Sequence, residues 1–124
     1  HIGNALWRFT KLPTLINSCS YDLFHGPSHV LPGRLECPSV VTMLDLIFMR
    51  YPQYFRAWDR NYYRISFSRS ARLADHIISI SKATKADLVN LFGIREEKIS
   101  VIYPGFDDVF TRLPRNRLDE ITKK

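Results

Sequence analysis

The chain has 124 residues, of which 45% are hydrophobic and 24% charged, and this composition is typical of a single soluble globular domain. No apolar run approaches the roughly 20 residues that a membrane-spanning helix requires, and the segment after His1 lacks the basic and apolar regions of a secretory signal. The net charge of +6 is compatible with nucleic acid, an anionic membrane surface or a phosphorylated substrate as partner, and equally with a solvated basic surface.

The N-terminal part of the chain is expected to form a short helix and a short strand. Apolar residues spaced three and four apart predict an amphipathic helix over residues 2–11. Pro13 either ends this helix or begins a second short turn. Residues 21–25 form the first expected strand, which Gly26-Pro27 closes.

The middle of the chain is expected to supply a buried strand and the longest helix. Residues 39–44 are apolar on both faces, which predicts a strand in a covered parallel sheet. The aromatic loop that follows, residues 46–55, either covers the end of the sheet or forms a wall for an acceptor. Helical spacing predicts a helix over residues 57–74. Its apolar stripe is expected to contain Trp58, Tyr62, Ile65 and Leu73, widened by Tyr63, Phe67, Ala71 and Ala74.

The last third of the chain alternates strand, helix and strand. Residues 76–80 form a strand, and residues 82–92 a helix whose free N–H groups Ser81 can cap. Gly93 stands where a left-handed C-terminal cap belongs. Residues 99–103 form the last expected strand. Helices that alternate with strands through short connections predict an α/β fold with a parallel, doubly wound, Rossmann-like sheet.

Candidate ligand-binding residues follow the carboxyl ends of the four expected strands, where parallel sheets bind ligands. They are His25-Gly26, Asp45, Ser81 and Pro104-Gly105. His25 could bond a sugar hydroxyl or could be a turn residue, and Asp45 could accept bonds from hydroxyls or cap the next turn. Ser81 is expected to be a helix cap, beside backbone N–H groups that suit an anion.

Other kinds of site are not supported by the sequence. The five glycines form no phosphate-binding loop, and the cysteines and histidines form no structural zinc set, so no metal is expected. The arginines of the long helix do not form the single basic stripe that a nucleic-acid groove needs, so no nucleic-acid partner is expected. These arginines could pair locally or attract anionic lipid.

Four segments resemble motifs of the family-4 glycosyltransferases, the retaining enzymes with two facing Rossmann-like domains known as the GT-B fold. Residues 21–27 resemble a D-hydrophobic-hydrophobic-H strand, and residues 37–46 resemble P-x-V-x-T-x-H-D-L. Residues 74–88 resemble A-D-x-I-I-x-x-S-x-x-x-x-x-D-L, and residues 98–107 resemble K-I-x-V-I-x-N/P-G-V/I-D. The order and spacing match over nearly the whole chain.

The resemblance implies a place in a larger enzyme. Residues 1–111 would be the second half of an N-terminal, acceptor-binding domain, followed by residues 112–124 as a charged tail or interdomain linker. A missing C-terminal domain would hold the nucleotide-diphosphate sugar donor. Transfer of a hexosyl or mannosyl group, with retention, would go to a sugar or lipid-linked acceptor. The enzyme is expected in the cytoplasm, either free or in peripheral contact with the cytoplasmic face of a membrane.

The resemblance also assigns the strand-end residues and shows a departure. His25 falls on the strand-end histidine of the family, and Asp45 on the aspartate of its His-Asp-Leu loop, which faces the cleft between domains. Ser81 and Pro104-Gly105 fall on positions that line the same cleft. Leu44 stands where relatives have a histidine that contacts the acceptor or the transferred sugar. The glycine-rich first loop and the C-terminal, Glu-containing donor motif of the family are both absent from this sequence, so the chain is expected to be inactive alone. Because of Leu44, a non-catalytic binding module or pseudoenzyme of the same fold is the alternative.

Overall fold

The computed structural model describes residues 2–107 and residue 110. The expected tail or linker, residues 112–124, lies outside the described residues, so the division of the chain at residue 111 stays a prediction. The helices and strands run in the order α1 Ile2–Asn17, β1 Phe24–Gly26, β2 Ser39–Met43, α2 Ile47–Arg50, η1 Pro52–Tyr54, α3 Ala57–Leu73, β3 His76–Ser79, α4 Lys82–Phe92, η2 Glu96–Lys98 and β4 Ile99–Val101.

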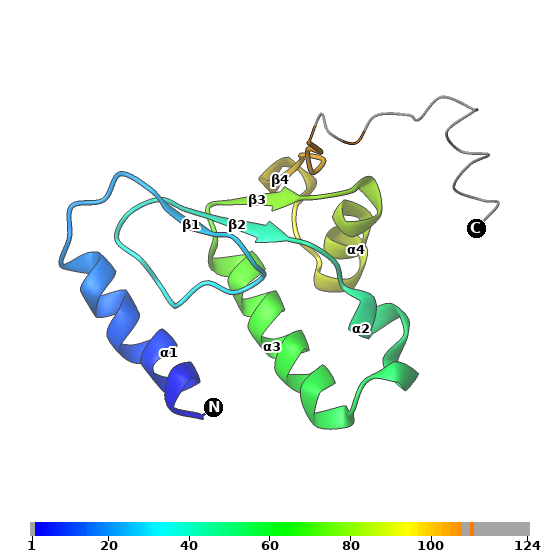
Figure 1. The fold of residues 1–124 in the computed structure, drawn as a ribbon, viewed down its shortest axis with the longest axis horizontal. Helices are drawn as coiled ribbons and strands as arrows, with labels where there is room; N and C mark the ends of the chain where they lie inside the picture. The colour runs from blue at the N-terminus through cyan, green and yellow to red at the C-terminus, as the bar shows by residue number, and fades with distance from the viewer. Residues whose placement is uncertain (1, 108–109, 111–124) are drawn as a thin grey trace, which may run out of the picture.

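The four strands form one parallel sheet in the order β1-β2-β3-β4. Each strand therefore pairs with the next one along the chain. The connection from β1 to β2 is a loop without a helix, whereas the connections from β2 to β3 and from β3 to β4 carry α3 and α4. Figure 1 shows α1, α3 and α4 below the sheet. This arrangement confirms the predicted α/β, Rossmann-like fold, and it is compatible with part of a GT-B N-terminal domain.

The hydrophobic core lies between one face of the sheet and the helices. Val41, Met43, Ile77 and Ile99 point to this face, because alternate residues of a strand share a side, and all four are buried. They belong to one cluster with residues of α3 and α4: Phe67, Ala71, Leu88 and Phe92. Their strand neighbours Val40, Thr42 and Ile78, which point the other way, are only half-buried.

The first helix is longer than the sequence predicted. Proline removes a helical hydrogen bond, so Pro13 was expected to interrupt the pattern. Instead α1 continues through Pro13 to Asn17, and this part of the prediction was wrong. Pro13 packs against the turn at Gly33, where an added Cβ would lie 3.2 Å from the proline ring. The proline ring thus lies beside a segment that is distant in the sequence.

The buried face of α3 also differs from the predicted stripe. Trp58 is 84% exposed and Ile65 is 63% exposed, and Tyr62 and Leu73 also face solvent, so the main stripe was wrong. The buried face consists of Ser66, Phe67, Ser70 and Ala71. Two of these residues are serines whose hydroxyl groups donate to helix carbonyls one turn earlier, which satisfies them away from water.

The strand-to-helix unit over β3 and α4 matches its prediction closely. Ser81 Oγ accepts a hydrogen bond from Thr84 N at 3.0 Å, which caps α4 as expected. Gly93 has φ 66° in the left-handed region, and Ile94 N donates to Leu88 O across it. None of the described helices is long and apolar enough to cross a bilayer.

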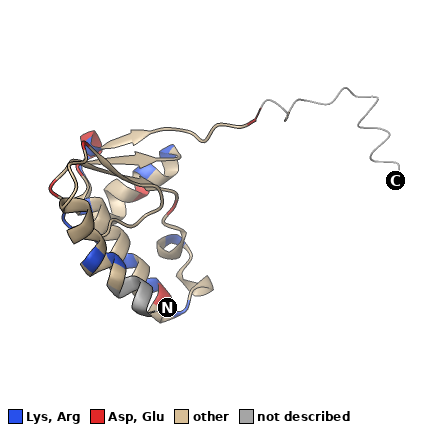
Figure 2. Ribbon diagram, turned by 60° about the vertical axis from the view of Figure 1, so that its left-hand side comes forward, with Lys and Arg blue, Asp and Glu red and all other residues tan. Residues whose placement is uncertain are grey.

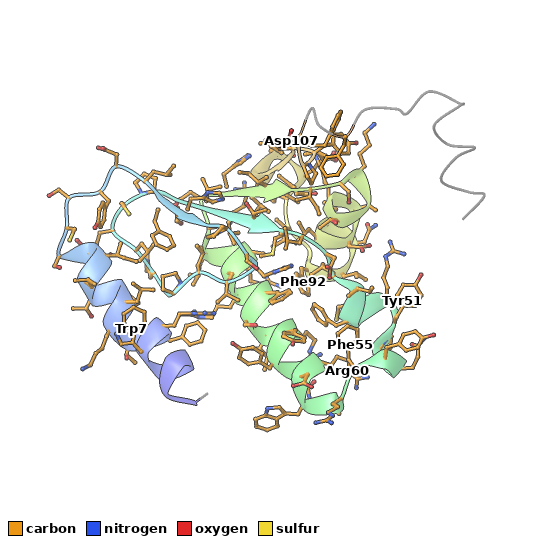
Figure 3. All side chains as sticks on the ribbon, in the orientation of Figure 1. Trp7, Tyr51, Phe55, Arg60, Phe92 and Asp107 are labelled. Atoms are coloured by element: carbon orange, nitrogen blue, oxygen red, sulfur yellow. The ribbon has the colours of Figure 1, made fainter. Side chains whose placement is uncertain are left out.

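The predicted strands are longer than those observed, and the predicted aromatic loop contains two short helices. Strand β1 begins at Phe24 and β4 ends at Val101, whereas the sequence predicted residues 21–25 and 99–103. Residues 46–55 include α2 and η1. Phe48 is buried, and the ring of Phe55 faces α3, where it contacts Tyr63 (Figure 3). This segment, which follows β2, therefore packs against α3.

Candidate site at the carboxyl ends of the strands

The parallel sheet brings the carboxyl ends of its strands to one edge. Gly26 ends β1, Asp45 comes two residues after β2, and Ser81 comes two residues after β3. The turn at Pro104-Gly105 follows β4 by three residues. Because all four strands run in the same direction, these segments leave the sheet at the same edge. Their role in binding stays a prediction.

Hydrogen bonds join the ends of β2 and β3 to the start of α4. Thr84 Oγ1 donates to Leu44 O at 3.0 Å, and the same hydroxyl lies 2.9 Å from Ser81 Oγ. Ser79 Oγ donates to Ser81 O at 2.6 Å. The residue that caps the helix is thus fixed to both strands. This network makes the first turn of α4 a rigid part of the edge.

Asp45 lies on this edge with its side chain exposed to solvent. Its Oδ1 accepts a hydrogen bond from Ile47 N at 3.1 Å, which is the turn-capping role that the sequence left open. A solvent-facing carboxylate held by its own turn can also accept hydrogen bonds from the hydroxyl groups of a ligand. The two roles use different lone pairs of one carboxylate, so they are compatible.

The two histidines near the end of β1 have different environments. His25 is exposed, and its Nε2 lies 2.8 Å from Thr42 Oγ1 on the neighbouring strand. His29 is half-buried, and its ring stacks on Phe67 with 4.3 Å between the centroids. Burial lowers the pKa of His29 below its ordinary value of 6.5, against a smaller opposing effect of the Asp45 carboxylate. His29 is therefore held in a neutral form beside the end of β2.

Pro104-Gly105 contributes less to this edge of the sheet than the other predicted site residues do. Both residues are exposed, and an added Cβ at Gly105 would meet nothing within 4 Å. The strand before them is fixed by Ile102 N, which donates to Ser79 O at 2.9 Å. The structure brings Ser81 and the Leu44–Asp45 turn together, whereas among the described residues no atom beyond Gly105 and its chain neighbours lies within 4 Å of a Cβ added at Gly105.

A bidentate ion pair fastens the aromatic segment to α4. Arg50 Nε donates to both carboxylate oxygens of Asp87, at 3.0 Å and 2.8 Å. Asp87 is buried, and its hydrogen bonds to the guanidinium raise the pKa of Arg50 above its usual value. Tyr51 and Tyr54, which follow Arg50, are 50% and 80% exposed. The pair thus holds two exposed aromatic rings near the edge.

A further aspartate of the sequence motifs lies at the opposite edge of the sheet. Asp75 accepts hydrogen bonds from Ser39 N at 2.7 Å and from Ser39 Oγ at 3.0 Å. These bonds lower the pKa of Asp75. The carboxylate joins the start of β2 to the segment before β3. A structural role therefore explains this residue.

Sequence reasoning did not anticipate the part that His29 and Thr84 play. His29 is not among the predicted site residues, yet its imidazole accepts a hydrogen bond from Leu44 N, just after the end of β2. The available signal was its place just after a strand end, which is where the crevice rule directs attention. Thr84 carried no signal apart from its position in the first turn of α4.

The surface hollow between α3 and α4 lies apart from these residues. It is lined by residues that include Arg64, Ile65, Arg72 and Leu91. None of the strand-end residues borders it. The strand-end network is the better candidate site, because it is built from parallel strand ends that partly buried hydrogen bonds hold together.

Comparison with known proteins gives one family. The family model described as Glycosyltransferase Family 4 matches residues 1–110 of this chain. No curated protein matches the chain significantly. The matched region contains the whole sheet, the candidate site and every helix that the structure describes.

Proposed function

The chain belongs to glycosyltransferase family 4, and from this premise we propose that it forms the acceptor side of the cleft in a retaining glycosyltransferase. The donor would be a nucleotide-diphosphate sugar, held by a C-terminal domain outside this chain. The acceptor would be a carbohydrate or a lipid-linked sugar, and the transferred group a hexosyl unit such as mannosyl. No metal is needed in this proposal.

The observation that carries the proposal is the exposed Asp45 carboxylate on a rigid strand edge. The turn of Asp45 is fixed through its own backbone and through the Thr84 bond to Leu44 O. Sugar hydroxyls are donors, and a carboxylate accepts two or more of them in defined directions. Glycosyl transfer depends strongly on how the attacking hydroxyl is positioned. A preorganised carboxylate on this edge suits that task.

The Asp45→Asn variant tests the proposal in the full-length protein. Transfer from GDP-mannose or UDP-glucose to octyl α-mannoside is measured as a steady-state rate. Loss of the charge should lower kcat/KM by about tenfold to a hundredfold, because hydrogen bonds to a charged acceptor contribute about 1.5–3 kcal/mol. The amide keeps a carbonyl oxygen that can still cap Ile47 N, so the fold is expected to be preserved.

Glu36→Gln is the matched control for Asp45→Asn. Glu36 is an exposed carboxylate before β2, at the opposite edge of the sheet, and its neutralisation should leave transfer unchanged. An Asp45→Asn protein as active as the wild type would refute the proposed acceptor role. A full-length wild-type protein that transfers no sugar from any nucleotide-sugar donor would favour the non-catalytic module, for which Leu44 is the supporting departure.

Peripheral contact with an anionic membrane is part of the same proposal, because a lipid-linked acceptor would lie at a membrane surface. The outward face of α3 supports it. Trp58 and Ile65 project into solvent, and Arg64 and Arg72 border the same hollow as Ile65. Figure 2 shows basic residues recurring along the helices beneath the sheet. Exposed aromatic and aliphatic side chains beside arginines favour anionic lipid interfaces.

Vesicle sedimentation tests this contact. The full-length protein should sediment with vesicles rich in phosphatidylserine and dissociate when salt is raised, because surface charge attraction is screened. The double variant Trp58→Ser, Ile65→Ser should reduce the bound fraction several-fold, whereas Tyr54→Ser, at another exposed aromatic, should not. Equal binding to vesicles of neutral phosphatidylcholine, or equal loss in both variants, would count against this face.

A further inference from the structure

The imidazole of His29 is held by partners on both ring nitrogens. Nε2 lies 3.3 Å from Leu44 N and 3.5 Å from Asp45 N, and both backbone groups donate to it. Nδ1 lies 3.1 Å from Ser28 Oγ. A backbone N–H can only donate, so Nε2 must carry a lone pair and the proton must be on Nδ1. The contacts therefore select a single neutral tautomer.

The backbone of His29 is hydrogen-bonded to β2, the strand that Leu44 and Asp45 follow. His29 N donates to Thr42 O at 2.8 Å. Its φ of 53° lies in the left-handed region, and among the described residues no other non-glycine has a positive φ. Side chains other than glycine seldom adopt this conformation, and such outliers concentrate at functional sites. The turn after β1 thus takes an unfavourable conformation that directs the ring to the end of β2.

The place of His29 has a direct consequence for Asp45. The bond from Asp45 N to the imidazole and the bond from Ile47 N to the carboxylate together define where the Asp45 side chain points. The imidazole thus reaches the backbone of Leu44 from the loop that follows β1.

We propose that neutral His29 is a positioning residue that holds the Leu44–Asp45 turn, and with it the Asp45 carboxylate, in place for the acceptor. This proposal rests on the proposed function of Asp45. His29 is not a catalytic residue, because both of its ring nitrogens are occupied by protein groups. Its contribution passes through Asp45 alone.

Protonation would break this arrangement. An imidazolium has no lone pair on Nε2, so the two amides would lose their acceptor. Of the groups around the ring, Asp45 is the charged one, and its carboxylate favours the imidazolium, whereas burial opposes it more strongly. Phe67, from α3, does not titrate, and His25 is the nearby titratable group on β1, bonded to the side chain of Thr42.

The sign of the pH effect follows from the lowered pKa. Because the folded state binds this proton less readily than the unfolded state, the turn is at full stability above about pH 6.5 and loses stability as the pH falls below that value. The position of Asp45 should therefore degrade in acid. Transfer that depends on Asp45 should show an acid limb that His29 sets.

Nuclear magnetic resonance of the full-length protein tests the contact without any substrate. The amide signals of Leu44 and Asp45 should titrate together with the ring carbon signals of His29, and this titration should vanish from both amides in His29→Gln. The glutamine carbonyl oxygen replaces Nε2 as an acceptor that does not titrate. His76→Gln, at the start of β3, is the control and should leave both titrations unchanged. Amides that do not follow His29 would overturn the proposal.

Kinetics with octyl α-mannoside then test the positioning role. His29→Phe keeps an aromatic ring to stack on Phe67 but removes the acceptor, so the KM for this probe should rise about tenfold, with little change in the KM of the donor. His29→Gln should restore the KM and abolish the acid limb. An unchanged KM in His29→Phe would overturn the positioning role. An unchanged KM in Asp45→Asn would instead refute the proposed function, and the amide titration would still decide whether His29 holds the turn.

Discussion

Replacing Phe48 with alanine is expected to lower the free energy of unfolding by about 3–4 kcal/mol, within the range for large-to-small substitutions of buried aromatic residues. Phe48 is only 2% exposed. Its ring meets those of Phe55, Tyr63 and Phe67 at centroid distances of 6.5, 5.7 and 5.3 Å. Removing it opens a cavity between α2 and α3, which rigid rings on three sides cannot fill.

Urea unfolding followed by circular dichroism measures this loss. The control is Tyr54→Ala, since Tyr54 is 80% exposed in the same segment and its removal should change stability by less than about 0.5 kcal/mol. Comparable losses in the two variants would mean that the aromatic segment is not packed as described. An unchanged slope with denaturant would show that the unfolding reaction itself is the same in both proteins.

Ser70→Ala is expected to cost about 2 kcal/mol, although it removes a single oxygen atom. Ser70 is fully buried, and its Oγ accepts a hydrogen bond from Leu31 N at 2.9 Å while donating to Ser66 O at 2.8 Å. Alanine would leave the N–H of the buried Leu31 without an acceptor, and an unsatisfied buried donor costs about 1–3 kcal/mol. Thermal unfolding should show the loss as a Tm lower by several degrees.

Ser66→Ala provides the comparison for Ser70→Ala. Ser66 is also buried in α3, but its hydroxyl only donates to carbonyls of its own helix, so its removal leaves no donor unsatisfied. The expected loss is below about 0.5 kcal/mol, since alanine also favours helix. If both variants lost the same stability, the bond between α3 and the segment after β1 would not be the cause.

Local signals in the sequence predicted α4 well and α3 less well. Ser81 and Gly93 mark the ends of α4 through their own chemistry, and this chemistry does not depend on the rest of the fold. In α3 the sequence favoured the large apolar side chains of Trp58 and Ile65 for the core. The structure instead buries Ser66 and Ser70, because small residues allow the close approach of other segments. Which face of a helix is buried is decided by tertiary packing.

In the candidate site, too, the sequence predicted one part of the arrangement and missed another. The parallel order of the strands, inferred from the alternation of elements, was enough to bring the ends of β1, β2 and β3 to one edge. The contact between His29 and the Leu44–Asp45 turn depends on a left-handed backbone conformation at His29, which no local pattern in the sequence specifies. Similarly, the neighbour of Pro13 is Gly33, which is far along the chain and which no local pattern identifies.

The first six residues of α4 have a mechanical consequence for the edge. Thr84 is bonded to the end of β2, and Asp87, almost one helical turn later, is bonded to Arg50 at the end of α2. Any tilt or axial rotation of α4 would therefore displace the Leu44 carbonyl and the Arg50 guanidinium in concert. If another domain or a partner pushed on α4, the displacement would reach Tyr51 and Tyr54 through the ion pair of Asp87 with Arg50, without passing through the sheet.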